Sequence, residues 1–261
     1  MISGAEARRI GQALASVAEW TSEMIVVLNE EVSDGTDRIA ASHGAKVFRE
    51  AWKGHIAQKN SAMEKAAQPW ILGLDADEAV SDKLRDEILA LPDSWANFAA
   101  YSFPRCTNYF GRWIRHGEWY PDRCTRLWQR GKARWSGIDP HDRLSVDGAT
   151  GKLRGDLLHY GAETLNKQVA KTVAYADDFA RHCQEEGRRV HLADLAVRPV
   201  WRFARGYGLK LGFLDGWQGF TIAWMTAFYT FLRYARAREA RLAAEGDTAS
   251  RRDDTQYAAR H

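Results

Sequence analysis

The sequence predicts an α/β fold, because apolar runs of strand length alternate with segments of helical periodicity through about residue 90. The runs at 24–28, 45–48 and 70–74 are expected to be strands, and the segments 36–41 and 55–67 are expected to be helices. Such alternation is typical of βαβ units and predicts a mainly parallel sheet.

The remaining elements follow from the same periodicities, and the pattern changes after Pro92. Strands are expected at 99–103, 125–129, 144–146 and 152–158, and helices at 4–19 and 163–186. A turn and helix cap is expected at SDGT, residues 33–36, just before the helix at 36–41.

Length and composition describe an ordinary folded protein. The 261 residues suffice for one large or two small domains, and 45% are hydrophobic. A net charge of +3, without a helix-turn-helix or RNP motif, argues against nucleic-acid binding. Three widely spaced cysteines (Cys106, Cys124 and Cys183) form no CxxC pair, which argues against a disulfide framework or zinc knuckle and favours the cytoplasm.

The most informative stretch is WILGLDADE at 70–78, where an apolar run ends in Asp75, Asp77 and Glu78. Open α/β sheets bind ligands at the carboxyl ends of their strands. Clustered carboxylates there are typical ligands of Mg²⁺ or Mn²⁺, which usually complete their coordination with substrate phosphates. The alternative is a solvated acidic turn in which Ser81 caps the next helix.

Tryptophan is abundant, at 11 residues, and four of them fall close together among arginines. The tryptophans are Trp113, Trp119, Trp128 and Trp135, and the interleaved arginines are Arg112, Arg115, Arg123 and Arg126. These side chains could line a sugar or nucleotide cleft, or the aromatic ones could belong to a core.

The last third contains Phe213–Leu232, a mostly apolar stretch flanked by cations on both sides. Asp215 and Gln218 within it argue against a simple membrane span. We expect residues 195–241 to lie at an anionic membrane surface. The alternatives are a helical hairpin packed on the catalytic domain or on a second subunit, and a true span.

Several segments together resemble the family 2 glycosyltransferases, and within them the bacterial lipopolysaccharide core-sugar transferases. They are EARRIGQALASV, IVVLNEEVSDGT, HIAQKN, LGLDADE, NYFGRWIRHGEWYPDRCTRLWQRG, PHDRL, LRGDLLHY and GYGLKLGFLDGWQG. The resemblance implies a GT-A fold over 1–190, with a Rossmann-like nucleotide-binding half and a mixed, mostly parallel sheet. Amphipathic, membrane-proximal helices at 191–242 and a disordered tail at 243–261 are expected to follow.

The resemblance also implies the activity of an inverting hexosyltransferase dependent on Mg²⁺ or Mn²⁺. The expected donor is a nucleotide sugar, in the first place a UDP-sugar, and the expected acceptor is a glycolipid or the lipopolysaccharide core. The enzyme is expected to be cytoplasmic and peripheral on the inner face of the cell membrane, with a homodimer as an option. The alternatives are transfer to exopolysaccharide or capsule precursors, and a non-catalytic membrane-associated paralogue.

Residue roles follow by matching the family motifs to this chain. The metal ligands would be Asp77 and His159, the donor-binding residues Asn29, Lys59, Asn60, Asp75 and Arg126, and the catalytic pair His141 and Asp142. A sugar hydroxyl is a poor nucleophile at neutral pH, so a carboxylate such as Asp142 is expected to take its proton. Asp142 could instead pair with Arg143 or Arg123, and His159 could be a core histidine.

The chain departs from the family pattern at two places. It begins at Met1, almost at the end of the family's first strand, so we expect either that upstream codons encode this strand or that Met1–Ser3 replaces it in part; we favour the former. Asn29 stands near the position of an aspartate that binds the nucleotide in the family. An amide keeps the hydrogen bonding but loses the charge.

Overall fold

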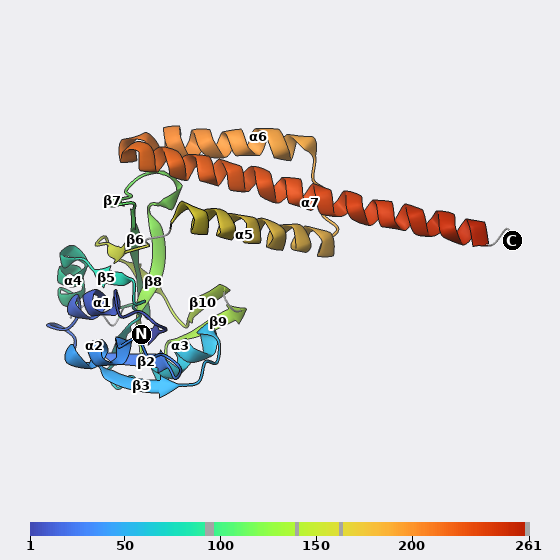
Figure 1. The fold of residues 1–261 in the computed structure, drawn as a ribbon. Coiled ribbons are helices and arrows are strands. Elements are labelled where there is room, and N and C mark those ends of the chain that lie inside the picture. Colours follow the sequence, from blue (N-terminus) through green and yellow to red (C-terminus); the bar gives the residue numbers. More distant parts are fainter. Residues whose placement is uncertain (92–96, 139–140, 162–163, 259–261) are drawn as a thin grey trace. The chain divides into compact units, whose positions relative to one another are not determined.

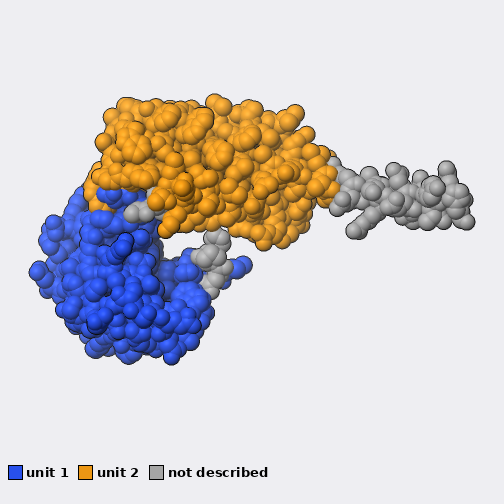
Figure 2. All heavy atoms as spheres, in the orientation of Figure 1, with its two compact units in different colours: residues 1–108, 120–161 blue, residues 109–119, 162–261 orange. Residues whose placement is uncertain are grey.

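The computed structural model describes residues 1–91, 97–138, 141–161 and 164–258 (Figure 1), with the side chains of His141 and of residues 245–258 left out. The chain divides into two compact units (Figure 2). Unit 1 comprises residues 1–108 and 120–161, and unit 2 comprises residues 109–119 and 162–261. The predicted domain boundary at residue 190 stays a prediction.

Unit 1 begins with a parallel sheet of order β1-β2-β3, which confirms the expected alternation of strands and helices. Its strands are β1 (Ile2–Ser3), β2 (Ile25–Asn29) and β3 (Lys46–Glu50), and its helices are α1 (Ile10–Ala15), α2 (Thr36–Ser42) and α3 (His55–Glu64). Apolar side chains of β2 and α1 form the core between them, among them Val26 and Ile10, which are fully buried.

Helix α1 is shorter than the segment 4–19 predicted as helical. The backbone N–H groups of Glu6 and Ala7 donate to the side chains of Thr36 and Asp34, at 3.0 and 3.1 Å. Asp34 also accepts from the backbone N–H and the hydroxyl of Thr36, at 3.1 and 2.6 Å. The predicted SDGT turn is therefore present, and it also holds the approach to α1 in a non-helical turn. The N-cap of α2 is Gly35, which makes no side-chain cap hydrogen bond.

A second sheet has the order β4-β8-β6-β12-β5, with β11 also paired to β6. Its strands are β4 (Trp70–Leu72), β5 (Glu78–Val80), β6 (Ala100–Tyr109), β8 (Asp122–Gln129), β11 (Thr150–Lys152) and β12 (Leu157–His159). Beside it, β9 (Ala133–Ile138), which sequence reasoning missed, forms an antiparallel hairpin with β10 (His141–Val146).

The mixed character of the sheet structure is confirmed: the pairings within β1-β2-β3 and those of β6 with β11 and β12 are parallel, while β4-β8, β6-β8, β12-β5 and β10-β9 are antiparallel. The strand predicted at 70–74 was expected in the mainly parallel part. It pairs antiparallel with β8 instead, with Ile71 opposite Trp128. A short apolar run is compatible with either direction, because its side chains are buried in both cases.

The strand predicted at 152–158 is divided into β11 and β12 by a close approach to helix α4 (Asp82–Leu89). A Cβ on Gly155 would lie 2.3 Å from the Cα of Leu84, so only glycine fits there. Ser81 caps α4 by accepting from the N–H of Leu84 at 3.2 Å, as expected. The helix packs on a core that includes Leu157, which is fully buried.

The tryptophan-rich segment does not form one cleft. Trp128 and Trp135 are 1% and 8% exposed and pack edge to face in unit 1, with ring centroids 6.2 Å apart. Trp119 packs on Tyr109 in unit 2, at 5.2 Å between centroids. For these three tryptophans the core alternative holds.

Unit 2 is helical. It contains β7 (Arg112–Trp113), η2 (Gly117–Trp119), α5 (Leu165–Glu185), α6 (Leu192–Phe203), the π-helical η3 (Ala204–Leu209), η4 (Gly212–Asp215) and α7 (Gly216–Ala258). Helices α5 and α6 both pack against α7 (Figure 1). No helix in the described part of the chain is long and apolar enough to cross a membrane.

The late GFLDG motif is a structural tie within unit 2. The buried carboxylate of Asp215 accepts from the backbone N–H groups of Arg115 and His116, at 3.1 and 2.8 Å. A Cβ on Gly219 would lie 1.9 Å from the carbonyl oxygen of Gly212. These glycines let η4 and the start of α7 approach closely, so the motif serves packing here.

Candidate active site

The two predicted metal ligands, Asp77 and His159, lie side by side. Strand β12 pairs on one edge with β5, where His159 faces Glu78, and on the other with β6, where it faces Thr107. This register places His159 Nε2 3.4 Å from Asp77 Oδ2, and His159 Nδ1 3.2 Å from the Thr107 hydroxyl. Strand pairing thus explains why residues distant in sequence share one site.

Asp77 keeps a negative charge in this position. Burial raises the pKa of its carboxyl, but the hydrogen bond and charge of His159 outweigh burial, and the net pKa is lowered. The side chain is 29% exposed and has Arg9 Nη1 at 3.8 Å. Its backbone carbonyl accepts from the N–H of Tyr160 at 2.8 Å, which holds the turn in place.

The other two carboxylates of the motif surround Arg126, which comes from β8. The Arg126 Nη2 atom donates to Asp75 Oδ2 and lies 3.1 Å from Glu78 Oε1. Glu78 is 1% exposed and also accepts the backbone N–H of Asp75, at 3.0 Å. In this structure the guanidinium of Arg126 bonds both carboxylates. Its predicted role in binding phosphate stays a prediction.

The pKa values in this trio move in different directions. Burial raises the pKa of Glu78 although the charge of Arg126 opposes it. At Asp75 burial is again the largest effect, but the charges of Arg126 and Lys59 together lower the pKa. Burial would lower the pKa of Arg126, yet Glu78 and Asp75 raise it above its ordinary value.

Lys59 and Asp142 form a second charged pair, between α3 and β10. Lys59 Nζ lies 2.6 Å from Asp142 Oδ2, and the side chains are 14% and 16% exposed. The partner of Asp142 is therefore Lys59 and not Arg143 or Arg123, the alternatives that the sequence suggested. Arg123 instead donates to the carbonyl oxygens of Ser102 and Leu153.

Trp135, one of the four tryptophans noted in the sequence, organises this second pair. Lys59 Nζ lies 4.3 Å from the centroid of its ring, and the guanidinium carbon of Arg126 lies 5.7 Å from it. Asn60, predicted to bind the donor, exchanges two hydrogen bonds with the Trp135 backbone, at 2.9 and 3.0 Å. The tryptophan-arginine spacing alone carried no signal that one ring would serve both cations.

Two further predicted site residues are placed less completely. Asn29 ends β2 opposite Glu50 of β3, and its carbonyl accepts from the N–H of Val32 at 3.1 Å. The backbone of His141 starts β10, while its side chain lies outside the described part of the structure. The roles expected for both residues stay predictions.

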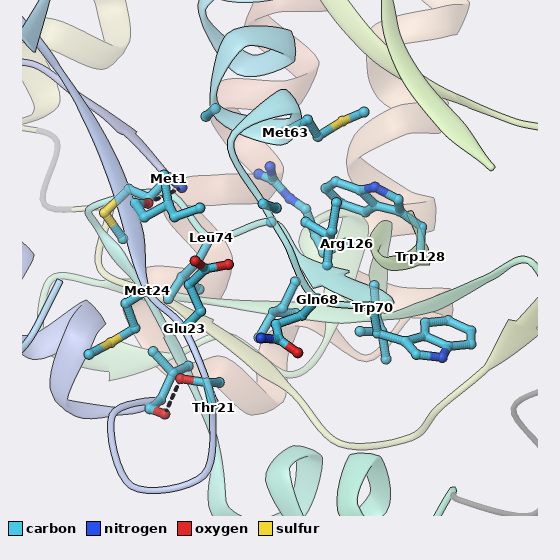
Figure 3. Close-up of a pocket in the computed structure, with 18 of the residues that line it drawn as sticks. Met1, Thr21, Glu23, Met24, Met63, Gln68, Trp70, Leu74, Arg126 and Trp128 are labelled. Carbon is cyan, nitrogen blue, oxygen red and sulfur yellow. Dashed lines mark hydrogen bonds between the residues drawn. The ribbon is translucent and has the colours of Figure 1, made fainter. Parts of the chain in front are cut away.

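A cavity of about 430 Å³ lies beside β1, between the start of β2 and β4 (Figure 3). Its walls are mostly apolar and include Met1, Met24 and Trp70, while Arg126 lines it near Leu74. The Met1 ammonium donates to the carbonyl of Ile25 at 2.9 Å, and burial lowers its pKa to about 6. The cavity is also lined by Lys59 and Arg126, whose positive charges would complement a diphosphate.

The donor atoms at Asp77 and His159 fit a divalent cation only with help from a ligand. The described residues contain no group of three or more His, Cys, Asp or Glu side chains arranged to hold a metal. One carboxylate and one imidazole suit Mg²⁺ or Mn²⁺ when a diphosphate and water supply the remaining oxygens. An isolated metal without a nucleotide would be bound weakly at such a site.

Comparison with solved structures matches this chain to TarS from S. aureus. Its 1–349 fragment superimposes with a TM-score of 0.47 at 11% identity, covering 94% of this chain and 90% of that one. The same fragment in complex with UDP-GlcNAc gives a TM-score of 0.43 at 14% identity, with coverage of 93% and 91%.

Sequence comparisons are more specific. The model of "Glycosyl transferase family 2" matches residues 4–147, more than half of the chain. Glycosyltransferases of Rickettsia prowazekii and Rickettsia typhi are each 30% identical, covering 94% and 96% of this chain and 87% and 89% of their own lengths. The lipopolysaccharide core biosynthesis glycosyltransferase LpsC of Rhizobium meliloti is 28% identical over 81% of this chain and 83% of its own length. The predicted resemblance, the fold class and the enzyme class are thereby confirmed: the chain belongs to glycosyl transferase family 2 and is a glycosyltransferase.

Proposed function

We propose that this glycosyltransferase transfers a sugar with inversion from a UDP-sugar to a glycolipid of the lipopolysaccharide core, at the inner face of the cell membrane. The observation that carries the proposal is the adjacency of Asp77 and His159, an acid and an imidazole 3.4 Å apart. Similarity to LpsC supports the acceptor class. Transfer to exopolysaccharide or capsule precursors is the outcome that would replace it.

The donor side is built from Asp77 and His159. Their oxygen and nitrogen donors would hold Mg²⁺ or Mn²⁺, which supplies positive charge for the departing diphosphate. The lowered pKa of Asp77 keeps this carboxylate ionised at neutral pH. Lys59, which lines the cavity, would provide a further cation near the donor, and Asp75, which accepts a hydrogen bond from Arg126, would accept another from the ribose.

The acceptor side is built around Asp142. Its carboxylate would accept the proton of the attacking sugar hydroxyl while that oxygen forms its bond to the anomeric carbon. The hydroxyl then takes the position beside Asp142 that Lys59 Nζ occupies, 2.6 Å away, in this structure. Lys59 is free to turn toward the diphosphate, so one side chain links the two halves of the reaction.

Donor binding is tested first by thermal unfolding with a panel of UDP-, GDP-, ADP- and CMP-sugars, with and without Mn²⁺. A bound donor raises the midpoint by mass action, and we expect UDP-sugars to do so only when Mn²⁺ is present. Asp77→Asn should abolish this shift, while the control Asp147→Asn, which changes an exposed carboxylate 3.6 Å from Lys132, should retain it. A shift that survives Asp77→Asn would contradict the proposed metal site.

Transfer itself is tested with the donor so identified and lipopolysaccharide-core oligosaccharides. The anomeric configuration of the product, read by NMR, should be opposite to that of the donor. Retention of configuration would refute the single-displacement proposal, and transfer only to capsule-type acceptors would refute the acceptor.

A further inference from the structure

Helix α6 carries its apolar side chains on the outside. Leu192, Val197, Val200 and Trp201 are 68%, 64%, 70% and 55% exposed, and no residue of the helix is buried. An amphipathic helix of a globular protein normally turns such a face toward the core. The apolar face of α6 therefore has no partner within the described part of unit 2.

Helix α7 shows a matching stripe. Trp217, Phe220, Trp224, Phe228 and Phe231 follow one another at steps of three or four residues, so they share one side of the helix. Their exposed fractions are 59%, 47%, 60%, 38% and 43%. Other residues of α7 are buried, among them Ile222, which packs with Tyr109 and Ile114, and Tyr234, which packs with Ala180 and Cys183.

The two stripes meet through aromatic contacts. Phe203 at the end of α6 lies 5.8 Å from Phe220 and 6.2 Å from Trp224 of α7, between ring centroids. Tyr207 of η3 lies 5.7 Å from Phe220 and 6.3 Å from Phe213. The outward side chains of α6 and of the first half of α7 therefore form one surface, the outer apolar face.

Cations outnumber acids in the segment that carries this face, and its acids are turned inward. Between residues 192 and 232 the only carboxylates are Asp194 and Asp215, whose side chains are 16% and 4% exposed. Arg202, Arg205 and Lys210 all lie within 4 Å of the carboxylate of Glu118, which is 13% exposed. Three cations around one carboxylate leave this part of unit 2 with a net positive charge.

The charge pattern favours lipid over a second copy of the chain. A twofold dimer through the outer apolar face would bring two copies of this positively charged part of unit 2 toward each other, and their repulsion costs free energy. Anionic headgroups complement the cations, and tryptophan is the residue that most favours the boundary between headgroups and acyl chains. Exposed aliphatic and aromatic side chains bordered by arginine are typical of helices that lie on a membrane surface.

We propose that the outer apolar face of α6 and α7 docks on an anionic lipid monolayer, with Trp201, Trp217 and Trp224 at the level of the headgroups. This inference deepens the proposed function, on which it rests for the lipid-linked acceptor. Docking would keep the enzyme where its acceptor is concentrated.

The test is co-sedimentation of the full chain with vesicles of phosphatidylcholine, alone or with about 30% phosphatidylglycerol. We expect binding to the anionic vesicles, weakened at least about tenfold in neutral vesicles or in high salt. The double variant Trp201→Ser with Trp224→Ser should lose at least about tenfold in partitioning, because it removes two exposed rings; of the two, Trp224 also gives up its contact with Phe203. The matched control is Leu165→Ser with Val169→Ser, two exposed apolar residues of α5, and it should bind like the parent.

The inference would be overturned if the parent chain did not sediment with anionic vesicles. It would also be overturned if both double variants lost vesicle binding equally. A dimer in light scattering that the tryptophan variant abolishes without any lipid binding would overturn it as well. Transfer to a lipid-free core oligosaccharide separates this inference from the proposed function. If the tryptophan variant keeps that transfer but loses vesicle binding, docking is supported. If the parent chain binds vesicles but neither it nor the variants transfer sugar to the core oligosaccharide, the acceptor proposal alone is refuted.

Discussion

Replacing Arg126 with methionine removes the charge between Asp75 and Glu78 while keeping a long side chain in the core of unit 1. Arg126 is 7% exposed and Glu78 is 1% exposed, so the variant leaves a buried carboxylate whose remaining cation is the more distant Arg105, at 3.7 Å. Removing one partner of a buried ion pair costs about 3–5 kcal/mol. We expect the free energy of unfolding of unit 1 to fall by about this amount at pH 8.

The loss should depend on pH, with a sign that the structure dictates. Burial already raises the pKa of Glu78 above 4.5, and loss of the opposing charge of Arg126 raises it further. A carboxyl whose folded-state pKa exceeds its unfolded value binds more protons in the folded state between the two values. Stability of the variant should therefore fall as pH rises from about 4.5 through the raised pKa, by about 1.4 kcal/mol per unit of pKa shift.

The assay is urea unfolding followed by circular dichroism at pH 5 and pH 8. The double variant Arg126→Met with Glu78→Gln also removes the buried charge of Glu78, so it should lose less stability at pH 8 than the single variant. Arg85→Met is the control, because Arg85 pairs with Asp86 on the surface and should show no such pH dependence. A loss below about 1 kcal/mol, or an equal loss at both pH values, would refute the reasoning.

Three further predictions follow from individual positions. Gly155→Ala should cost about 2 kcal/mol or more in unfolding free energy, because the new Cβ would lie 2.3 Å from Leu84 Cα. Gly4→Ala should be nearly neutral, because a Cβ there would have no atom within 4 Å. Equal effects of the two variants would contradict the predicted clash. Burial lowers the pKa of the Met1 amine from 8.0 to about 6, so the unfolded state binds more protons than the folded state between these pH values. The free energy of unfolding should therefore rise from pH 6 to pH 8 by up to about 2.7 kcal/mol. N-terminal acetylation should remove this rise, and its persistence would assign the rise to another group. Asp142→Asn should lower kcat about 10² to 10⁴-fold with little change in the donor-induced thermal shift, and a normal kcat would exclude Asp142 as the base.

Local elements of unit 1 could be predicted from the sequence because their signals are local. Periodicity and side chains within one turn account for the apolar run at 25–29, the Asp34–Thr36 turn and the helix at 55–64. The acidic residues after residue 74 were identifiable for the same reason. The family motifs added the pairing of Asp77 with His159, which spacing alone does not contain.

Pairings between distant segments could not be predicted in the same way. Backbone hydrogen bonds are the same for every strand, so nothing in the run at 70–74 specifies the antiparallel partner β8. The salt bridge of Lys59 with Asp142 joins residues 83 positions apart and depends on how α3 meets the β9-β10 hairpin. Charge patterning offered Arg143 and Arg123 as partners because a sequence records proximity only along the chain.

By itself the sequence determined the family, the alternation of elements in the first part of the chain and the amphipathic character of residues 192–231. Tertiary structure decided which carboxylates meet a cation and which meet a histidine, since strand register sets these distances. It also decided that the apolar side of α6 faces outward, because periodicity defines a stripe but not the direction in which packing turns it.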